Sequence, residues 1–142
     1  MTHAMKKIMN RFLLLLCVLV AGCAAKVDTA GAPRPKVLRD VEGYAIASCL
    51  VHQAQPYLKD QGDAWASAVI QRGKAPVEAL ATIHDAVKRE IARGDMAVIR
   101  AETGPQKDKA LPVLYCGEII DSPPVRAAIQ KAVAELGPLY GR

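Results

Sequence analysis

The chain has 142 residues, of which 51% are hydrophobic and 23% charged, and its formal net charge is +5. This length corresponds to a single domain. The positive charge is not spread over that domain, because three of the 19 Lys and Arg residues lie within the first 11 positions and, from Val41 onward, basic and acidic residues number 12 each. This balance excludes the dense basic face that nucleic-acid binding requires.

Residues 1–22 have the parts of a bacterial lipoprotein signal peptide. Basic residues (Lys6, Lys7 and Arg11) precede an apolar run from Phe12 to Val20, which is much shorter than the roughly 20 residues of a membrane-spanning helix. The segment LVAGC that ends at Cys23 resembles the lipobox, which predicts a lipid anchor on Cys23. The alternative is ordinary signal-peptide cleavage near Cys23. Ala24 favours the outer membrane, so we expect a periplasmic lipoprotein anchored there.

Two cysteines remain once Cys17 has left with the signal and Cys23 has taken lipid. They are Cys49 and Cys116, and an even pair in an oxidising compartment predicts a disulfide. The alternative is a thiol–imidazole pair between Cys49 and His52, which are one helical turn apart; this pair requires a free thiol.

The residues after the signal are expected to form a flexible tether and then helices. Residues 23–39 contain Gly31, Pro33 and Pro35 and resemble a mobile linker. Asp40 is expected to cap a helix that runs to about Gln55 and is stopped by Pro56. Asp63 then caps a short helix to Gly73, and Pro76 begins a third helix with apolar positions at Leu80, Ile83, Val87 and Ile91.

The second half of the domain contains one ambiguous segment, one loop and two further helices. Residues 95–101 fit either a strand or a helical continuation, and residues 102–109 form a polar, exposed loop. Residues 112–120 are expected to be helical, with Val113, Cys116 and Ile120 on one face, and a last helix runs from Asp121 or Ser122 to Gly137. The prediction is an all-α domain over residues 40–142: a small bundle of about five helices with one inter-helix disulfide.

The sequence offers little for catalysis. His52, His84 and the cysteines lack paired ligand spacings such as CxxC or HExxH, so we expect no metal and no cofactor. The acidic residues show no spacing suited to acid and base roles, so we expect a binding protein rather than an enzyme. The loop is either a solvated connector or a surface for specific contact, and its residues are Glu102, Thr103, Gly104, Pro105, Gln106, Lys107, Asp108 and Lys109.

Three segments, YAIASCLV, DQGDAWASAVIQRG and LPVLYCGEIIDSP, together with the exported start, resemble the type VI secretion system amidase immunity proteins. The resemblance covers most of residues 43–140 and is one of pattern and helix order. It implies an all-α domain, often a homodimer, with a disulfide between helices (here Cys49 and Cys116) and a protruding loop that enters the catalytic groove of the amidase (here residues 102–109).

The function that we expect is therefore that of an envelope lipoprotein that binds and blocks a peptidoglycan amidase effector. Its contact with the membrane would be through the lipid anchor. The alternative is an envelope scaffolding or assembly lipoprotein without catalytic activity, whose partner docks on an apolar helix face.

Overall fold

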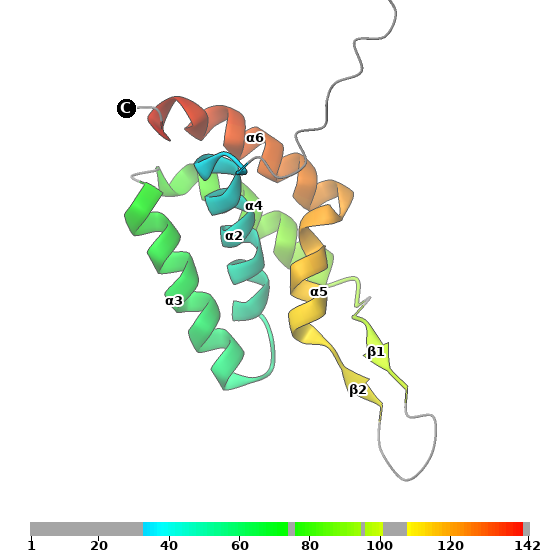
Figure 1. Cartoon of the computed structure of the whole chain (residues 1–142). Coiled ribbons are helices and arrows are strands. Elements are labelled where there is room, and N and C mark those ends of the chain that lie inside the picture. The colour runs from blue at the N-terminus through cyan, green and yellow to red at the C-terminus, as the bar shows by residue number, and fades with distance from the viewer. Residues whose placement is uncertain (1–32, 74–75, 95, 101–107, 141–142) are drawn as a thin grey trace, which may run out of the picture. The chain divides into compact units, whose positions relative to one another are not determined.

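Helix α2 (Lys36–Val51) is the central element of the fold, and every other α-helix that the structure describes packs against it. The structure is a computed structural model that describes residues 33–73, 76–94, 96–100 and 108–140. The helix is rich in small side chains, so its neighbours can approach closely on several sides. Figure 1 shows α2 between α3 on one side and α5 and α6 on the other.

The remaining elements complete a helical bundle with a small two-stranded extension. Four α-helices follow α2 in the described chain, with a 3₁₀ turn between the last two and two short strands after the third helix of the bundle. The predicted all-α bundle of about five helices is confirmed. The elements are α3 (Pro56–Gly73), α4 (Val77–Ile91), β1 (Val98–Ile99), β2 (Lys109–Ala110), α5 (Pro112–Glu118), η1 (Ile119–Asp121) and α6 (Pro123–Tyr140).

Several predicted helix limits are wrong. Helix α2 begins at Lys36 and ends at Val51, so Asp40 is not its cap and the last residues of the predicted tether are helical. Pro56 begins α3 instead of ending α2, because proline fits the first turn of a helix, where no backbone donor is needed. Asp63 consequently lies inside α3.

Helix α6 continues past its predicted end at Gly137. It runs through Pro138 to Tyr140. A glycine before the proline has no Cβ to clash with the pyrrolidine ring, which lessens the usual bar to helical backbone at that position. The Tyr140 hydroxyl donates a hydrogen bond to Asp40 Oδ2 at 3.2 Å, which attaches the end of α6 to α2.

The apolar faces predicted for α4 and α6 form the core. On α4, Leu80, Ile83 and Val87 are buried, and Ile91 is partly buried against them. On α6, the buried residues are Val125, Ile129, Ala132 and Leu136, as their helical spacing predicts. The periodicity thus located the core of the bundle correctly.

Helix α3 packs closely against the backbone of α2 at Gly62. A Cβ atom at this position would lie 2.7 Å from both Ala47 O and Val51 N. Both of these are backbone atoms and cannot rotate away. Glycine is therefore required for the observed distance between the two helices.

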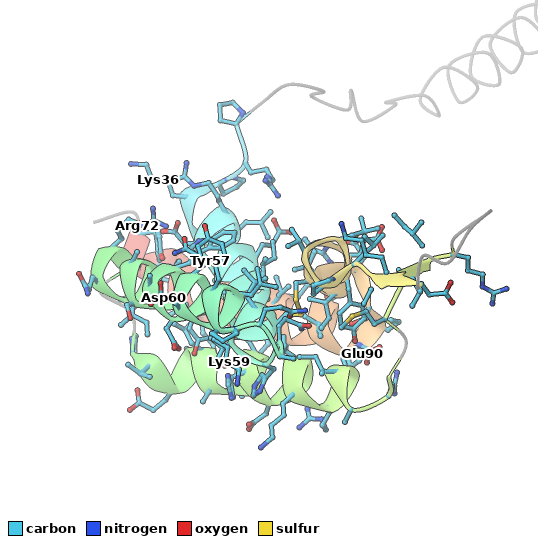
Figure 2. The ribbon with its side chains drawn as sticks, turned by 90° about the horizontal axis from the view of Figure 1, so that it is seen from below. Lys36, Tyr57, Lys59, Asp60, Arg72 and Glu90 are labelled. Atoms are coloured by element: carbon cyan, nitrogen blue, oxygen red, sulfur yellow. A yellow bond between two sulfur atoms is a disulfide. The ribbon has the colours of Figure 1, made fainter. Side chains whose placement is uncertain are left out.

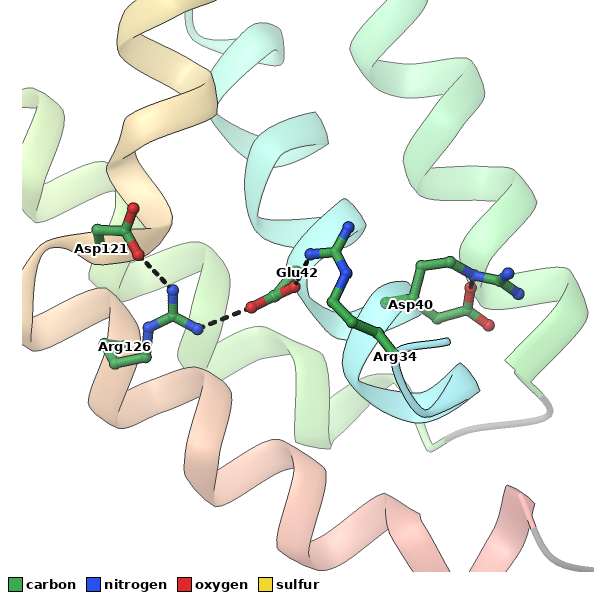
Figure 3. Close-up of polar contacts among 6 residues, drawn as sticks. Arg34, Asp40, Glu42, Asp121 and Arg126 are labelled. Atoms are coloured by element: carbon green, nitrogen blue, oxygen red, sulfur yellow. Dashed lines mark hydrogen bonds and ion pairs between the residues drawn. The ribbon is translucent and has the colours of Figure 1, made fainter. Parts of the chain in front are cut away.

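Two carboxylates, those of Asp40 and Glu42, are buried near the start of α2. Glu42 accepts hydrogen bonds from Arg34 at 2.6 Å and Arg126 at 2.7 Å, and Arg126 also donates to Asp121 at 2.5 Å (Figure 3). Asp40 accepts one from Arg72 of α3 at 3.0 Å. These charged pairs connect α2 with α3, η1 and α6. Their role is structural.

No helix among the described residues is both long and apolar enough to cross a membrane. The predicted signal peptide and the lipid anchor Cys23 lie outside the described residues.

Candidate functional site: a hairpin anchored by the disulfide

A short antiparallel strand pair projects from one end of the bundle (Figure 1). Val98 of β1 is opposite Ala110 of β2, and Ile99 is opposite Lys109. Leu111 N donates a further hydrogen bond to Ala97 O at 3.0 Å, which extends the pairing to the first residue before α5. We call β1 and β2 the hairpin. The ambiguous segment 95–101 therefore contains a strand.

The hairpin brackets the predicted contact loop. Residues 102–107 of that loop lie outside the described residues. Asp108 and Lys109 are described and exposed, and Lys109 belongs to β2. The two ends of the predicted loop are therefore brought together by paired strands.

The disulfide attaches the base of the hairpin to the core. Cys116 of α5 is bonded to Cys49 of α2 across 67 positions, with their Cα atoms 5.4 Å apart, and both residues are fully buried. Only Leu111 separates β2 from α5. The predicted inter-helix disulfide is confirmed, and it holds the short helix from which the hairpin extends.

A buried glutamine fills the space around this disulfide. The Gln53 side-chain amide donates to Cys49 O at 3.0 Å, and its nitrogen lies 3.4 Å from the sulfur of Cys116. Gln53 is only 3% exposed. It thus supports both the end of α2 and the crosslink, a role that no local pattern around Gln53 indicates.

Large apolar side chains are exposed on the hairpin and on the first turn of α5. Val98 and Ile99 belong to β1, and Val113 and Leu114 follow β2 closely; the four are between 47% and 63% exposed. We call these four residues the apolar set. Val113 was expected on the buried face of its helix, but the helix turns it outward and buries Cys116. The prediction failed because α5 has only seven residues, and the apolar spacing of so short a helix does not define which face is buried.

The described residues do not assemble reactive groups at this site. Cys49 is in the disulfide, so the alternative of a free thiol paired with His52 is excluded in this structure. Among all the residues that the structure describes, no three His, Cys, Asp or Glu side chains lie close enough together to hold a metal ion. What the hairpin offers is a shaped surface with apolar and charged side chains.

Comparison of the chain with protein-family models, with curated proteins and with solved structures found no match in any of the three.

Proposed function

We propose that this protein is an envelope lipoprotein that acts by binding, as an immunity protein that blocks a peptidoglycan amidase of a type VI secretion system. Residues 102–109 and the hairpin that carries them form the contact surface in this proposal. The lipid on Cys23 anchors the protein to the outer membrane on its periplasmic side. No group of this protein takes part in catalysis; the amidase supplies the catalytic residues.

The observation that carries the proposal is the attachment of the hairpin to a crosslinked core. A loop that is already ordered at its base loses less conformational entropy when it enters a cleft, which favours tight binding. The disulfide contributes to this order because it fixes α5, which follows β2 after a single residue.

The apolar set adds to the expected binding energy. Each of its side chains is half exposed in the free protein, and burial of apolar surface stabilises a complex by roughly 25 cal/mol per Å². Arg100 and Lys109 lie next to these side chains in the chain and are also exposed. The proposed partner surface is therefore an apolar cleft with acidic groups at its rim.

The proposal is tested by protection and binding. Cells that export candidate amidases are made to co-express the natural protein or the double variant Ile99→Ser/Val113→Ser. We expect the natural protein to restore growth, and we expect the double variant to protect poorly and to bind the amidase at least about tenfold more weakly in calorimetry, because central apolar residues often dominate an interface.

Val77→Ser is the matched control, because Val77 is 53% exposed and lies at the start of α4, outside the hairpin. It should protect as well as the natural protein. Failure of the natural protein to protect against any exported amidase would contradict the proposal, as would equal loss of binding in the control.

The scaffolding alternative is favoured by one observation, since Val113 and Leu114 present apolar surface on a helix rather than on a strand. Replacement of residues 102–107 by glycine and serine separates the two functions. An amidase inhibitor should lose its activity with this replacement, whereas a scaffold that docks on α5 should keep its partner.

A further inference from the structure

Two histidines from different helices meet beside the carboxyl end of α2. The rings of His52, the residue directly after α2, and His84 of α4 have their centroids 5.1 Å apart and are tilted by 45°. This contact brings together residues separated by 32 positions (84 − 52). It involves no residue of the hairpin.

Two lysines complete a basic cluster around these rings. Lys88 is one helical turn after His84 on α4, so the two share a face. Lys59 belongs to α3 and lies between the ribbons of α3 and α4 in Figure 2. Both lysines act electrostatically on His52. We call His52, Lys59, His84 and Lys88 the basic cluster.

The basic cluster has no acidic partner in the described part of the chain. None of its four side chains takes part in an ion pair within 4.0 Å there, whereas the arginines around the start of α2 (Arg34, Arg39, Arg72 and Arg126) all do so. Asp60 directly follows Lys59 on α3, and Asp85 directly follows His84 on α4, but neither carboxylate forms an ion pair with the cluster. The cluster therefore lacks an ion-pair partner among the described residues.

The carboxyl end of α2 compensates this charge only weakly. Free carbonyl groups at a helix end carry partial negative charge. Here Cys49 O accepts hydrogen bonds from His52 N at 3.1 Å and from the Gln53 side chain at 3.0 Å, and Leu50 O accepts one from Gln53 N at 3.1 Å. The whole helix end carries only about half an elementary negative charge, which is less than the charge of the two lysines.

The behaviour of His52 agrees with a crowded positive site. Burial, the largest cause, lowers its pKa below the usual 6.5, and the charges of His84, Lys88 and Lys59 lower it further. A bound anion would oppose the effect of these three positive groups on the pKa of His52. A cation such as zinc would instead be repelled by the two ammonium groups.

We propose that His52, Lys59, His84 and Lys88 form a binding site for a phosphate group, independent of the hairpin. A phosphate group is negatively charged near neutral pH and presents several acceptor oxygens in a tetrahedral arrangement, which suits donors that come from different elements of the fold. A carboxylate has only two oxygens for the same donors. The phosphate group belongs either to a free phosphate or to a phospholipid headgroup.

The imidazole of His52 makes this binding responsive to pH. A phosphate favours the charged form of the ring, so it raises the pKa of His52, and by linkage the ring takes up a proton when phosphate binds. The charged groups that act on His52 are Lys59 on α3 and His84 and Lys88 on α4.

The test is a pH titration of the histidine ring protons by NMR in inorganic phosphate and in chloride of equal ionic strength. We expect the pKa of His52 to be higher in phosphate than in chloride. Lys59→Ala and Lys88→Ala should each weaken phosphate binding by about tenfold, since each removes a charge-assisted hydrogen bond. Lys131→Ala is the matched control, because Lys131 lies on α6 and faces Glu135.

A second experiment identifies the source of the phosphate group. Flotation with vesicles of phosphatidylglycerol or of phosphatidylcholine shows whether the cluster prefers an anionic headgroup. Two outcomes support the proposal. One is a higher pKa of His52 in phosphate than in chloride. The other is flotation with phosphatidylglycerol vesicles that is lost in Lys88→Ala and retained in Lys131→Ala. Equal titrations in both salts together with no cluster-dependent flotation overturn it, as does an equal effect of Lys131→Ala.

Discussion

Asp40 and Glu42 are only two positions apart on α2, but their carboxylates pair with different parts of the fold. Asp40 is bound by Arg72 of α3 and by Tyr140 of α6, whereas Glu42 is bound by Arg34 and Arg126. Both carboxylates are at most 8% exposed. A buried carboxylate is tolerated only when it is paired and hydrogen-bonded, and here each has two donors.

Glu42→Gln tests the contribution of one of these carboxylates. The amide keeps the shape but not the charge, so two guanidinium groups lose their ionic partner, and we expect the free energy of unfolding to fall by about 1–3 kcal/mol. Urea denaturation measures the change. Glu118→Gln, at an exposed position on α5, should be nearly neutral. Equal stability of the two variants would contradict a structural role for Glu42.

Gly62→Ala tests the close approach of α3 to α2. The added methyl group would meet two backbone atoms at 2.7 Å, so the helices must separate, and overpacking of this kind typically costs about 1–3 kcal/mol. The expected result is a lower denaturation midpoint. Gly117→Ala provides the comparison, because its new methyl group would find no atom within 4 Å. A stabilised Gly62→Ala variant would show that the helices can separate freely.

At the scale of elements, α5 depends on its crosslink more than the longer helices do. It has seven residues, and Cys116 is its only buried residue. Isolated helices of this length are unstable in water, so tertiary attachment must hold it. The disulfide to α2 provides that attachment and thereby positions the hairpin.

Removal of the disulfide should weaken the fold and loosen the hairpin. For Cys49→Ala/Cys116→Ala we expect a loss of about 2–5 kcal/mol in the free energy of unfolding, in line with a closed loop of this length. Denaturation by urea with and without reductant measures it. Reductant should not affect the double variant, and hydrogen exchange of the Leu111 amide should be faster in it. Unchanged exchange would argue against anchoring of the hairpin by the disulfide.

The elements with strong local patterns could be predicted from the sequence. The spacing of Leu80, Ile83 and Val87 identified α4, and the cysteine count identified the disulfide. The partners of Asp40 could not be predicted, because they lie 32 and 100 positions away and leave no local trace. An aspartate before an apolar run has the same local pattern whether it caps a helix or forms a buried ion pair.

The candidate site was predicted in part. The polar composition of residues 102–109 located a loop, and the structure adds that strands bracket it. The exposure of Val98, Ile99 and Val113 was missed, since apolar residues in short segments are usually assigned to the core. The basic cluster was also missed, because His52 and His84 meet only through the packing of α2 on α4.

At the scale of the whole molecule, the stability of the fold depends on pH at both ends of the range, because the pKa values of two tyrosines and of His52 differ from their usual values. Burial first, and then the charge of Asp40, raises the pKa of Tyr140 above 10.0, and burial raises that of Tyr44. A raised pKa means that the folded state holds the proton more tightly, so this stability is complete below pH 10 and is lost as the pH rises through the folded value.

Tyr140→Phe should therefore flatten the alkaline part of the stability profile. Phenylalanine cannot titrate, so the fall above about pH 10 should be less steep, although the variant loses the bond to Asp40 at every pH. His52 acts in the opposite direction: its lowered pKa gives stability that is complete above pH 6.5 and lost on acidification. Thermal denaturation between pH 5 and pH 11 measures both, and a parallel alkaline fall in the variant would contradict the assignment.

The bond between Cys49 and Cys116 also determines how the protein responds to mechanical force. When the two chain ends are pulled apart, tension passes from α2 directly through the sulfur atoms to α5. The residues between the cysteines, which are separated by 67 positions and enclose α3, α4 and the hairpin, carry no load. At about 3.5 Å per residue, roughly 230 Å of chain stays hidden from a stretching experiment until the bond is reduced.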